Sequence, residues 1–186
     1  RLIRIIATVG VFLMPLAWFI LKDYQKKRIL VFMNPDIDPF GSGYHIIQSK
    51  IAIGSGTIFG KGLFNGTQSQ LNFLPENHTD FIFSVIGEEL GFIGCVIVLI
   101  LLFMLIYRSI KVAYTCNDRF GMLLATGISS MLCFEVLVNA GMTMGIMPVT
   151  GIPLPFISYG VSALTTNMIS IGILLNISMQ RTKYIF

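Results

Sequence analysis

Charged residues are scarce in this chain of 186 residues. They make up 12% of the sequence and hydrophobic residues make up 54%, whereas a soluble globular domain usually contains about 25% charged residues. This composition excludes an ordinary soluble domain and indicates a membrane protein. The net charge of +4 is modest, so the composition does not point to nucleic acid as a partner.

Cysteine and histidine are also few. Cys95, Cys116 and Cys133 lie in or beside apolar segments without metal-ligand spacing, which argues against a disulfide framework. The two histidines, His45 and His78, lack the second His, Cys or spaced carboxylate that would complete a zinc cage. The sequence therefore predicts no metal held by the protein's own side chains.

Four long apolar segments are present, at residues 2–21, 81–107, 120–138 and 161–178. A helix needs roughly 20 mostly apolar residues to cross a bilayer, so the sequence predicts an all-α polytopic membrane protein with four transmembrane helices. The chain begins at Arg1 without a methionine, and its first apolar segment lacks a signal-peptide cleavage site. We therefore expect a fragment of a longer protein.

Two connections between the apolar segments differ from short turns. Residues 22–80 form one long polar loop, in which residues 44–53 have the composition of a short interfacial helix. Residues 139–160 are rich in Gly and Pro yet nearly uncharged. Irregular backbone at membrane depth is tolerated only where protein or a water-filled cavity surrounds it. This second connection is therefore predicted to be re-entrant or pocket-lining.

The placement of Lys and Arg predicts the orientation. Basic residues cluster at the start of the chain, at residues 108–119 and at the end, whereas residues 139–160 contain none. Short basic segments remain in the cytoplasm. With alternating spans, the loop 22–80 and the Pro/Gly-rich segment 139–160 then both lie on the extracytoplasmic side.

Asp80 lies where the long loop enters the second apolar segment. On a helix that starts here, Ser84, Gly87 and Gly91 follow at +4, +7 and +11 and share the Asp80 face, and the two glycines allow another helix to approach closely. Two interpretations stay open. Asp80 is either an acid that complements the dipole of a first helical turn, or a general base at the rim of a protein-lined cavity.

Other acids lie deeper in the apolar segments. Glu88 falls about 80° from Asp80 around such a helix and is expected to share its cavity, whereas Glu89 falls about 180° away and is expected to pair with another helix. Glu135 and Asn139 lie one turn apart on the third segment. They form a second polar spot, which is either a hydrogen-bonded structural acid or a functional one.

Two motifs give the chain a family resemblance. The first is HTDFIF at residues 78–83, followed by GEELG at 87–91; the second is Asn139 followed by GIMPVTGIPLPFISYG at 145–160. Both resemble the SEDS proteins of bacteria (shape, elongation, division and sporulation; RodA, FtsW and SpoVE), and the loop before the first motif is more similar to the elongation branch, RodA. One departure is Val161, which stands where the family usually has a second glycine.

The resemblance implies a ten-span protein, of which residues 1–186 are the C-terminal half. It implies a multi-pass peptidoglycan glycosyltransferase of the bacterial cytoplasmic membrane, which polymerises lipid II on the outer side during cell elongation and whose essential acid matches Asp80. It also implies a class B penicillin-binding protein and the elongation machinery as partners. Polar residues of the other half contribute to the family's cavity, so this chain alone is expected to be inactive.

That chemistry suggests roles for further residues. Asp80 would deprotonate the hydroxyl of the acceptor sugar, and the polyprenyl diphosphate leaving group would need cations, for which Lys50, Lys61 or a divalent ion such as Mg²⁺ or Mn²⁺ are candidates. The other candidates for substrate binding are His78, Thr79, Glu88, Ser158 and Tyr159. The residues expected to shape the backbone are Gly87, Gly91, Pro148, Gly151, Pro153, Pro155 and Gly160.

Two other functions compete with catalysis. A lipid-linked precursor transporter (a flippase) also uses intramembrane acids and broken helices, and a scaffold for the penicillin-binding protein would need no chemistry. The location of the acid distinguishes a glycosyltransferase from a transporter, because a catalytic acid lies at the outer rim and a transport acid near the bilayer midplane. Asp80 at the loop junction favours catalysis, whereas Glu135 is compatible with transport.

Overall fold

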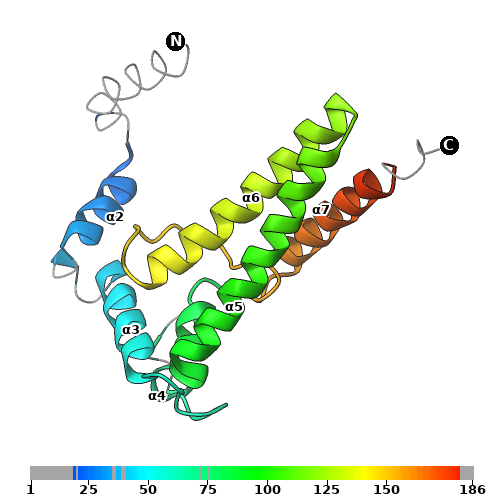
Figure 1. Ribbon diagram of the computed structural model, residues 1–186. Coiled ribbons are helices and arrows are strands. Elements are labelled where there is room, and N and C mark those ends of the chain that lie inside the picture. The colour runs from blue at the N-terminus through cyan, green and yellow to red at the C-terminus, as the bar shows by residue number, and fades with distance from the viewer. Residues whose placement is uncertain are drawn as a thin grey trace.

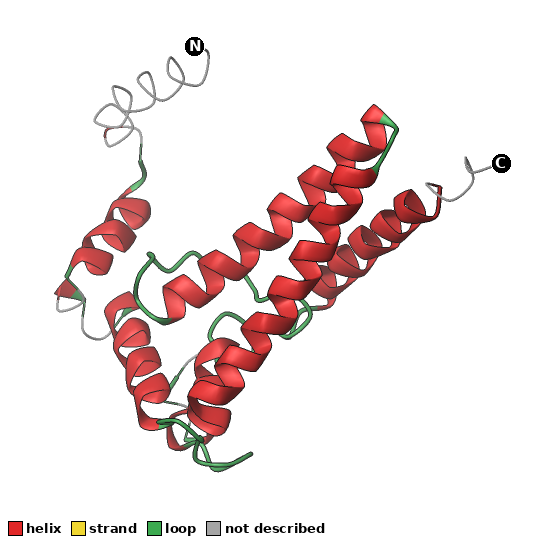
Figure 2. Ribbon diagram, in the orientation of Figure 1, coloured by secondary structure: helices red, strands yellow, loops and turns green. Residues whose placement is uncertain are grey.

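The computed structural model describes residues 19, 21–34, 37–38, 41–71, 73–74 and 76–180. Within these residues the regular structure is entirely helical (Figure 2), which confirms the all-α class. The first expected span, residues 2–21, lies almost wholly outside the described residues.

Among the described residues, three helices are long and apolar enough to cross a membrane: α5 (Ile82–Thr115), α6 (Arg119–Thr143) and α7 (Val161–Gln180). The second, third and fourth apolar segments of the sequence fall on them in order. At the start of α6, the Oδ2 atom of Asp118 accepts a hydrogen bond of 2.8 Å from the backbone N–H of Gly121, which satisfies a donor that has no partner within the helix.

The helices α5 and α6 form an antiparallel pair, joined by the turn at residues 116–118, and α7 packs beside both (Figure 1). Their shared core includes Leu102, Ile106, Ala125, Leu132, Val136 and Leu174. Other large apolar side chains remain outside this core; Phe103 is 68% exposed and Phe120 is 73% exposed. Such surfaces suit helices that face lipid or further protein.

The connection expected as one long loop, residues 22–80, contains three helices. Residues 44–53 lie within α3 (Ser42–Ser55), as predicted, and a single turn forms α4 (Thr67–Gln70). The helix α2 (Asp23–Met33) was not predicted. Its sequence DYQKKRILVFM consists mainly of residues that favour helix, so its charged start belongs to a helix rather than to a solvated loop.

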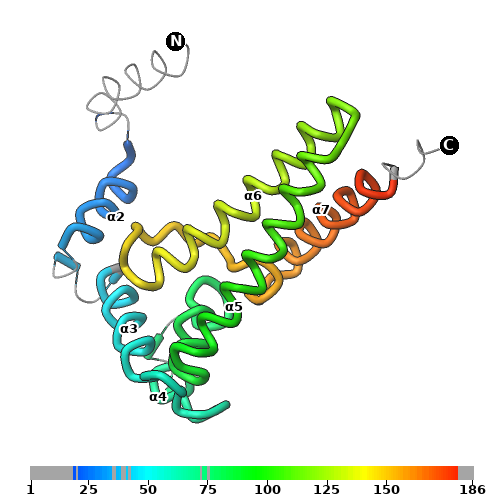
Figure 3. The backbone as a smooth tube through the Cα atoms, viewed as in Figure 1, coloured from blue at the N-terminus to red at the C-terminus, as the bar shows by residue number. Residues whose placement is uncertain are grey.

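The helix α5 is not straight, because Gly91 breaks it with φ 68° and ψ −164°. We call residues 82–90 the short arm and residues 92–115 the long arm. A Cβ atom added to Gly87 would lie 3.4 Å from the Sγ atom of Cys95, although residues eight apart in a straight helix are separated by about 12 Å. The two arms therefore turn back on each other. Figure 3 follows the backbone through this region.

This break corrects the expectation of one shared helical face. Asp80 precedes the helix, whose N-cap is Phe81, and Gly91 has a non-helical conformation. Asp80, Ser84 and Gly91 therefore do not lie on one continuous helix. The positive φ of Gly91 explains why glycine occupies this position, since residues with a Cβ atom rarely adopt that conformation.

Residues 57–62 close the broken helix. At a break, backbone N–H and C=O groups lose their partners within the helix, and an unpaired buried group is costly. Here four backbone groups of the loop replace those partners. After the break, the N–H groups of Phe92 and Ile93 donate to the carbonyls of Thr57 and Ile58, at 2.9 and 3.2 Å. Before the break, the carbonyls of Glu88 and Glu89 accept from the N–H groups of Lys61 and Gly62, both at 3.0 Å. We call residues 57–62 the clamp loop.

Candidate active site

Asp80 lies in the turn immediately before α5 and is partly buried. Phe81 is the N-cap of the helix, and no side chain makes the cap hydrogen bond, so Asp80 does not cap α5. Among the described residues, none donates a hydrogen bond to the Asp80 carboxylate. The carboxylate is therefore free to accept a proton from another molecule.

The backbone of Asp80, by contrast, is held firmly. The side-chain Nδ2 atom of Asn139, which is fully buried on α6, donates to the carbonyl of Asp80 at 2.9 Å and to the carbonyl of Ile152 at 2.8 Å. One amide group thus joins α6, the turn before α5 and the Pro/Gly-rich segment. In the sequence, Asn139 is one turn from Glu135, and nothing in the pattern predicts its contact with Asp80.

Two further links hold the residues before Asp80. The Oγ atom of Ser158 donates to the carbonyl of Thr79 at 2.7 Å and accepts from the backbone N–H of Leu154, also at 2.7 Å. The backbone N–H of Tyr159 donates to the carbonyl of His78 at 2.8 Å. The structure therefore brings four of the predicted substrate-binding residues together beside Asp80, although the Ser158 hydroxyl is already engaged with backbone groups.

The contacts of the short arm show how far Asp80 lies from the end of α6. The Oγ atom of Ser49 on α3 lies 2.6 Å from the Oγ atom of Ser84 and donates to the carbonyl of Thr143 at 2.6 Å. Asp80 and Ser84 thus lie beside α6 residues that are also four apart, Asn139 and Thr143. The short arm therefore runs parallel to the last turn of α6. Asp80 lies beside Asn139, one turn or about 6 Å before the last residue of α6.

The Pro/Gly-rich segment approaches the carboxylate closely. Gly151 has φ +75°, and a Cβ atom added there would lie 3.3 Å from the Oδ2 atom of Asp80. Pro155 is fully buried, and Pro148 and Pro153 are partly buried. At Gly151, backbone rather than a side chain therefore faces the Asp80 carboxylate.

Burial and two nearby charged groups shift the pKa of Asp80. Burial raises the pKa of Asp80 above its usual value, the carboxylate of Glu76 raises the pKa further, and the guanidinium of Arg28 lowers it. Arg28 lies on α2 and donates from Nη1 to the carbonyl of Val149 at 3.1 Å. The sequence gives no signal for Arg28 at this site, because it belongs to a charged run that is typical of a loop.

A histidine also lies behind this turn. The ring of His45 on α3 stacks against Phe81 with ring centroids 6.0 Å apart. Its Nδ1 atom is buried and has no hydrogen-bond partner among the residues that the structure describes. Burial lowers the pKa of His45, while the carboxylates of Glu76 and Asp38 raise it. The His45 ring packed against Phe81 supports the residue next to Asp80.

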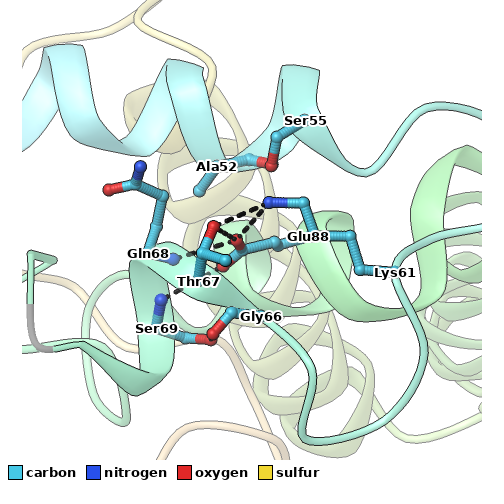
Figure 4. Close-up of polar contacts among 8 residues, drawn as sticks. All are labelled: Ala52, Ser55, Lys61, Gly66, Thr67, Gln68, Ser69 and Glu88. Atoms are coloured by element: carbon cyan, nitrogen blue, oxygen red, sulfur yellow. Dashed lines mark hydrogen bonds and ion pairs between the residues drawn. The ribbon is translucent and has the colours of Figure 1, made fainter.

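Glu88 and Lys61 are not brought to Asp80; they pair with each other. Glu88 is fully buried, and its Oε1 atom lies 2.9 Å from the Nζ atom of Lys61 (Figure 4). Its carboxylate also accepts hydrogen bonds from the Thr67 hydroxyl at 3.1 Å and from the backbone N–H groups of Gln68 at 2.9 Å and Ser69 at 3.1 Å. The expectation that Glu88 shares a cavity with Asp80 is therefore not met, since its carboxylate binds the loop that precedes Asp80.

The other polar candidates occupy separate places. The Lys50 side chain is exposed and packs against Gly145 at the start of the Pro/Gly-rich segment. Glu135 on α6 lies beside Asn167 on α7, and its buried Oε2 atom has no hydrogen-bond partner among the described residues. Among the described residues, no three His, Cys, Asp or Glu side chains come together as a metal site.

A groove of about 590 Å³ opens beside the candidate base. It lies between the start of α5, the end of the Pro/Gly-rich segment and the start of α7. Its walls are His78, Ile82, Phe156, Ile157, Ser158, Tyr159, Gly160, Val161 and Leu164. Most of these side chains are apolar, so the groove suits a ligand with both an apolar part and a polar head.

Known proteins share this sequence and fold. Residues 1–183 match the family described as cell cycle proteins, FtsW/RodA/SpoVE. The chain is 50% identical over 182 residues to the peptidoglycan glycosyltransferase MrdB of Escherichia coli K12, which covers 97% of this chain and 49% of MrdB. It is 49% identical over 162 residues to the peptidoglycan glycosyltransferase RodA of Treponema pallidum, which covers 87% of this chain and 37% of that protein.

The fold agrees with these sequence matches. A solved peptidoglycan synthase complex contains a chain with a TM-score of 0.71 and 34% sequence identity, covering 97% of this chain and 50% of that one. The present chain thus spans about half the length of the curated relatives it matches. It belongs to the FtsW/RodA/SpoVE family, the SEDS proteins, as part of a larger multi-pass protein of the inner membrane.

Proposed function

We propose that this chain forms part of a peptidoglycan glycosyltransferase that polymerises lipid II during cell elongation, with its active site open to the outer side of the membrane. Relatives at about half identity bear the name of that activity. The observation that carries the proposal is Asp80, a partly buried carboxylate without a hydrogen-bond donor among the described residues, on a backbone fixed by Asn139. A general base must be both free to take a proton and fixed in position.

The proposed step is a displacement at the anomeric carbon of the donor sugar. The hydroxyl of the acceptor sugar attacks this carbon, Asp80 takes the hydroxyl proton, and the bond to the polyprenyl diphosphate breaks. The raised pKa of Asp80 supports this role, because a base works best when its pKa is close to the operating pH.

The leaving diphosphate needs positive charge. Arg28 is a suitable group, because it lies close enough to Asp80 to lower the pKa of that carboxylate. Lys50 is a second candidate, since its exposed amine lies over the Pro/Gly-rich segment. Lys61 is less suitable, because Glu88 already engages it. A divalent ion, Mg²⁺ or Mn²⁺, would supply further charge if bound together with the diphosphate.

The substrate's lipid chain needs an apolar surface next to the base. The groove between Ile82 and Leu164 provides one, and His78 at its wall is two residues from Asp80. We assign the polyprenyl chain to this groove. Because the similar solved structure is a peptidoglycan synthase complex, we further propose a class B penicillin-binding protein as the partner that cross-links the new strand.

The test is polymerisation of lipid II by the full-length protein, purified with its penicillin-binding partner. Wild type is compared with Asp80→Asn, which keeps the size of the side chain but removes the base. The matched control is Asp118→Asn at the start of α6, where Asn also caps a helix. We expect polymer from wild type and from the control, and at least a hundredfold less from Asp80→Asn, the lower end of general-base contributions.

Undiminished polymer from a folded Asp80→Asn variant would exclude the general-base role. The transporter alternative gives a different result, because vesicles containing the protein would then move lipid II between leaflets without forming polymer. Glu135 is the acid to change in that case, since its Oε2 atom lies buried and unpaired between α6 and α7.

A further inference from the structure

A second groove lies at the other end of the bundle from Asp80. It runs between the last turns of the long arm of α5 and the second half of α7, and its volume is about 410 Å³. Its apolar wall includes Leu105, Val112, Ile171 and Leu174. Nothing in the proposed reaction uses this groove, because its lining begins 25 residues after Asp80, on the long arm that leads away from the clamp loop.

Two cations lie on the wall of this groove. Arg108 and Lys111 are three residues apart on α5 and therefore on neighbouring positions of one helix face. Both side chains are exposed. Among the described residues, the ion pairs are Lys27 with Asp38 and Lys61 with Glu88, so no carboxylate neutralises this pair of cations.

The neighbouring elements supply little negative charge that could compete with an anionic ligand. The sequence of α7, VSALTTNMISIGILLNISMQ, contains no charged residue. Asp118 at the start of α6 is the one acid in the adjoining turn, and it already accepts a hydrogen bond from Gly121. An apolar groove whose wall carries two cations without an ion-pair partner among the described residues matches a ligand with an apolar chain and an anionic head.

We propose that this groove binds one anionic phospholipid, with its phosphate on Arg108 and Lys111 and an acyl chain along the apolar wall. Basic pockets between membrane helices recognise anionic lipid headgroups in this way. The chain's own segments outside the described residues fit less well. Residues 1–18 and 181–186 contain basic residues and no Asp or Glu, so either segment would bring positive charge to a site that is already positive.

The test measures lipid retention by the full-length protein. Native mass spectrometry in detergent compares phosphatidylglycerol with phosphatidylcholine for wild type, for Arg108→Gln with Lys111→Gln, and for a control pair, Lys22→Gln with Lys26→Gln. We expect wild type and the control to retain phosphatidylglycerol in preference to phosphatidylcholine. The groove variant should bind phosphatidylglycerol at least about tenfold more weakly, since each basic residue contributes about 1 kcal/mol to such binding.

A second variant separates the site from general loss of structure. Leu175 lines the groove and is 60% exposed, so Leu175→Trp should fill the groove and lower phosphatidylglycerol retention with both cations still present. Equal retention of the two lipids by wild type, or unchanged retention in both groove variants, would overturn the proposal. Displacement of the lipid by inorganic phosphate alone would also overturn it, because it would show a simple phosphate site.

Discussion

The Nδ2 atom of Asn139 lies 2.9 Å from the carbonyl oxygen of Asp80. The same amide group reaches the carbonyl of Ile152 at 2.8 Å, so one buried side chain of α6 sets the spacing between the candidate base and the Pro/Gly-rich segment that faces it. Among the described residues, the hydrogen bonds of the Asn139 amide go to backbone carbonyls and not to the Asp80 carboxylate. We therefore expect Asn139 to be a positioning residue, whose effect on catalysis passes through backbone geometry.

Replacing Asn139 by Ala should lower both the activity and the stability of the protein. Both donated hydrogen bonds are lost, which costs about 1–3 kcal/mol in unfolding free energy because buried carbonyls are left unpaired. We expect kcat for lipid II polymerisation to fall at least about tenfold, since small displacements of a catalytic group have large effects on rate. Asn117→Ala, in the exposed turn between α5 and α6, should change neither quantity. Equal losses for both variants would contradict the positioning role.

The pH dependence of polymerisation should respond in opposite directions to two charge changes. A general base works when ionised, so activity is lost as pH falls through the pKa of Asp80. Glu76→Gln removes a group that raises the Asp80 pKa, and Arg28→Gln removes one that lowers it. The acid limb of the pH–rate profile should therefore move to lower pH in Glu76→Gln and to higher pH in Arg28→Gln.

The control for these shifts is Glu89→Gln, since Glu89 is not among the charges that act on Asp80. Its acid limb should coincide with that of wild type. Profiles that move in the same direction for Glu76→Gln and Arg28→Gln would show that another group controls the acid limb. Both shifts should become smaller at high salt, because salt screens interactions between partly exposed charges.

Removing the buried carboxylate of Glu88 should destabilise the protein strongly. Glu88→Ala leaves the amine of Lys61 and the N–H groups of Gln68 and Ser69 without their acceptor, and breaking a buried ion pair in this way costs about 3 kcal/mol or more. Thermal unfolding of the full-length protein in detergent measures the effect. Glu89→Ala serves as the control, and an unfolding temperature for Glu88→Ala equal to that of the control would mean that the pair contributes little.

Because of the bend at Gly91, we expect Gly91→Ala to destabilise the protein, and Gly127→Ala is the matched control. In Gly91→Ala the new Cβ atom would lie 2.6 Å from the carbonyl oxygen of Ile58. The alanine would also have to adopt a φ of +68°. Each of these effects is unfavourable, and the strained backbone alone costs about 1–3 kcal/mol. Gly127→Ala on α6 meets no atom within 4 Å and should be neutral or slightly stabilising. A Gly91→Ala protein as stable as Gly127→Ala would be incompatible with the observed bend.

Sequence patterns predicted the features that depend on residues close together in the chain. Continuous apolar runs located α5, α6 and α7, and the motif around Asp80 led to the family. The prediction that Asp80, Ser84 and Gly91 share one helical face was wrong, because Gly91 adopts a non-helical conformation. The residues that bind the backbone on both sides of this break, 57–62, lie some 30 positions earlier in the chain. The partners of Glu88 were missed for the same reason, since Lys61 and Thr67 reach it only after the loop has folded back. Contacts between distant segments leave no periodic signal in the sequence.

The clamp loop also has a consequence for how the protein is made. Residues 57–62 leave the ribosome before α5, so the groups that complete the broken helix are already synthesised when the helix enters the membrane. If the loop were shortened, the carbonyls of Glu88 and Glu89 and the N–H groups of Phe92 and Ile93 would lose those partners, and unpaired backbone groups are costly at membrane depth. A deletion that looks like a harmless change to an external loop would then act as a defect in membrane insertion, and degradation of the newly made chain would be its first sign.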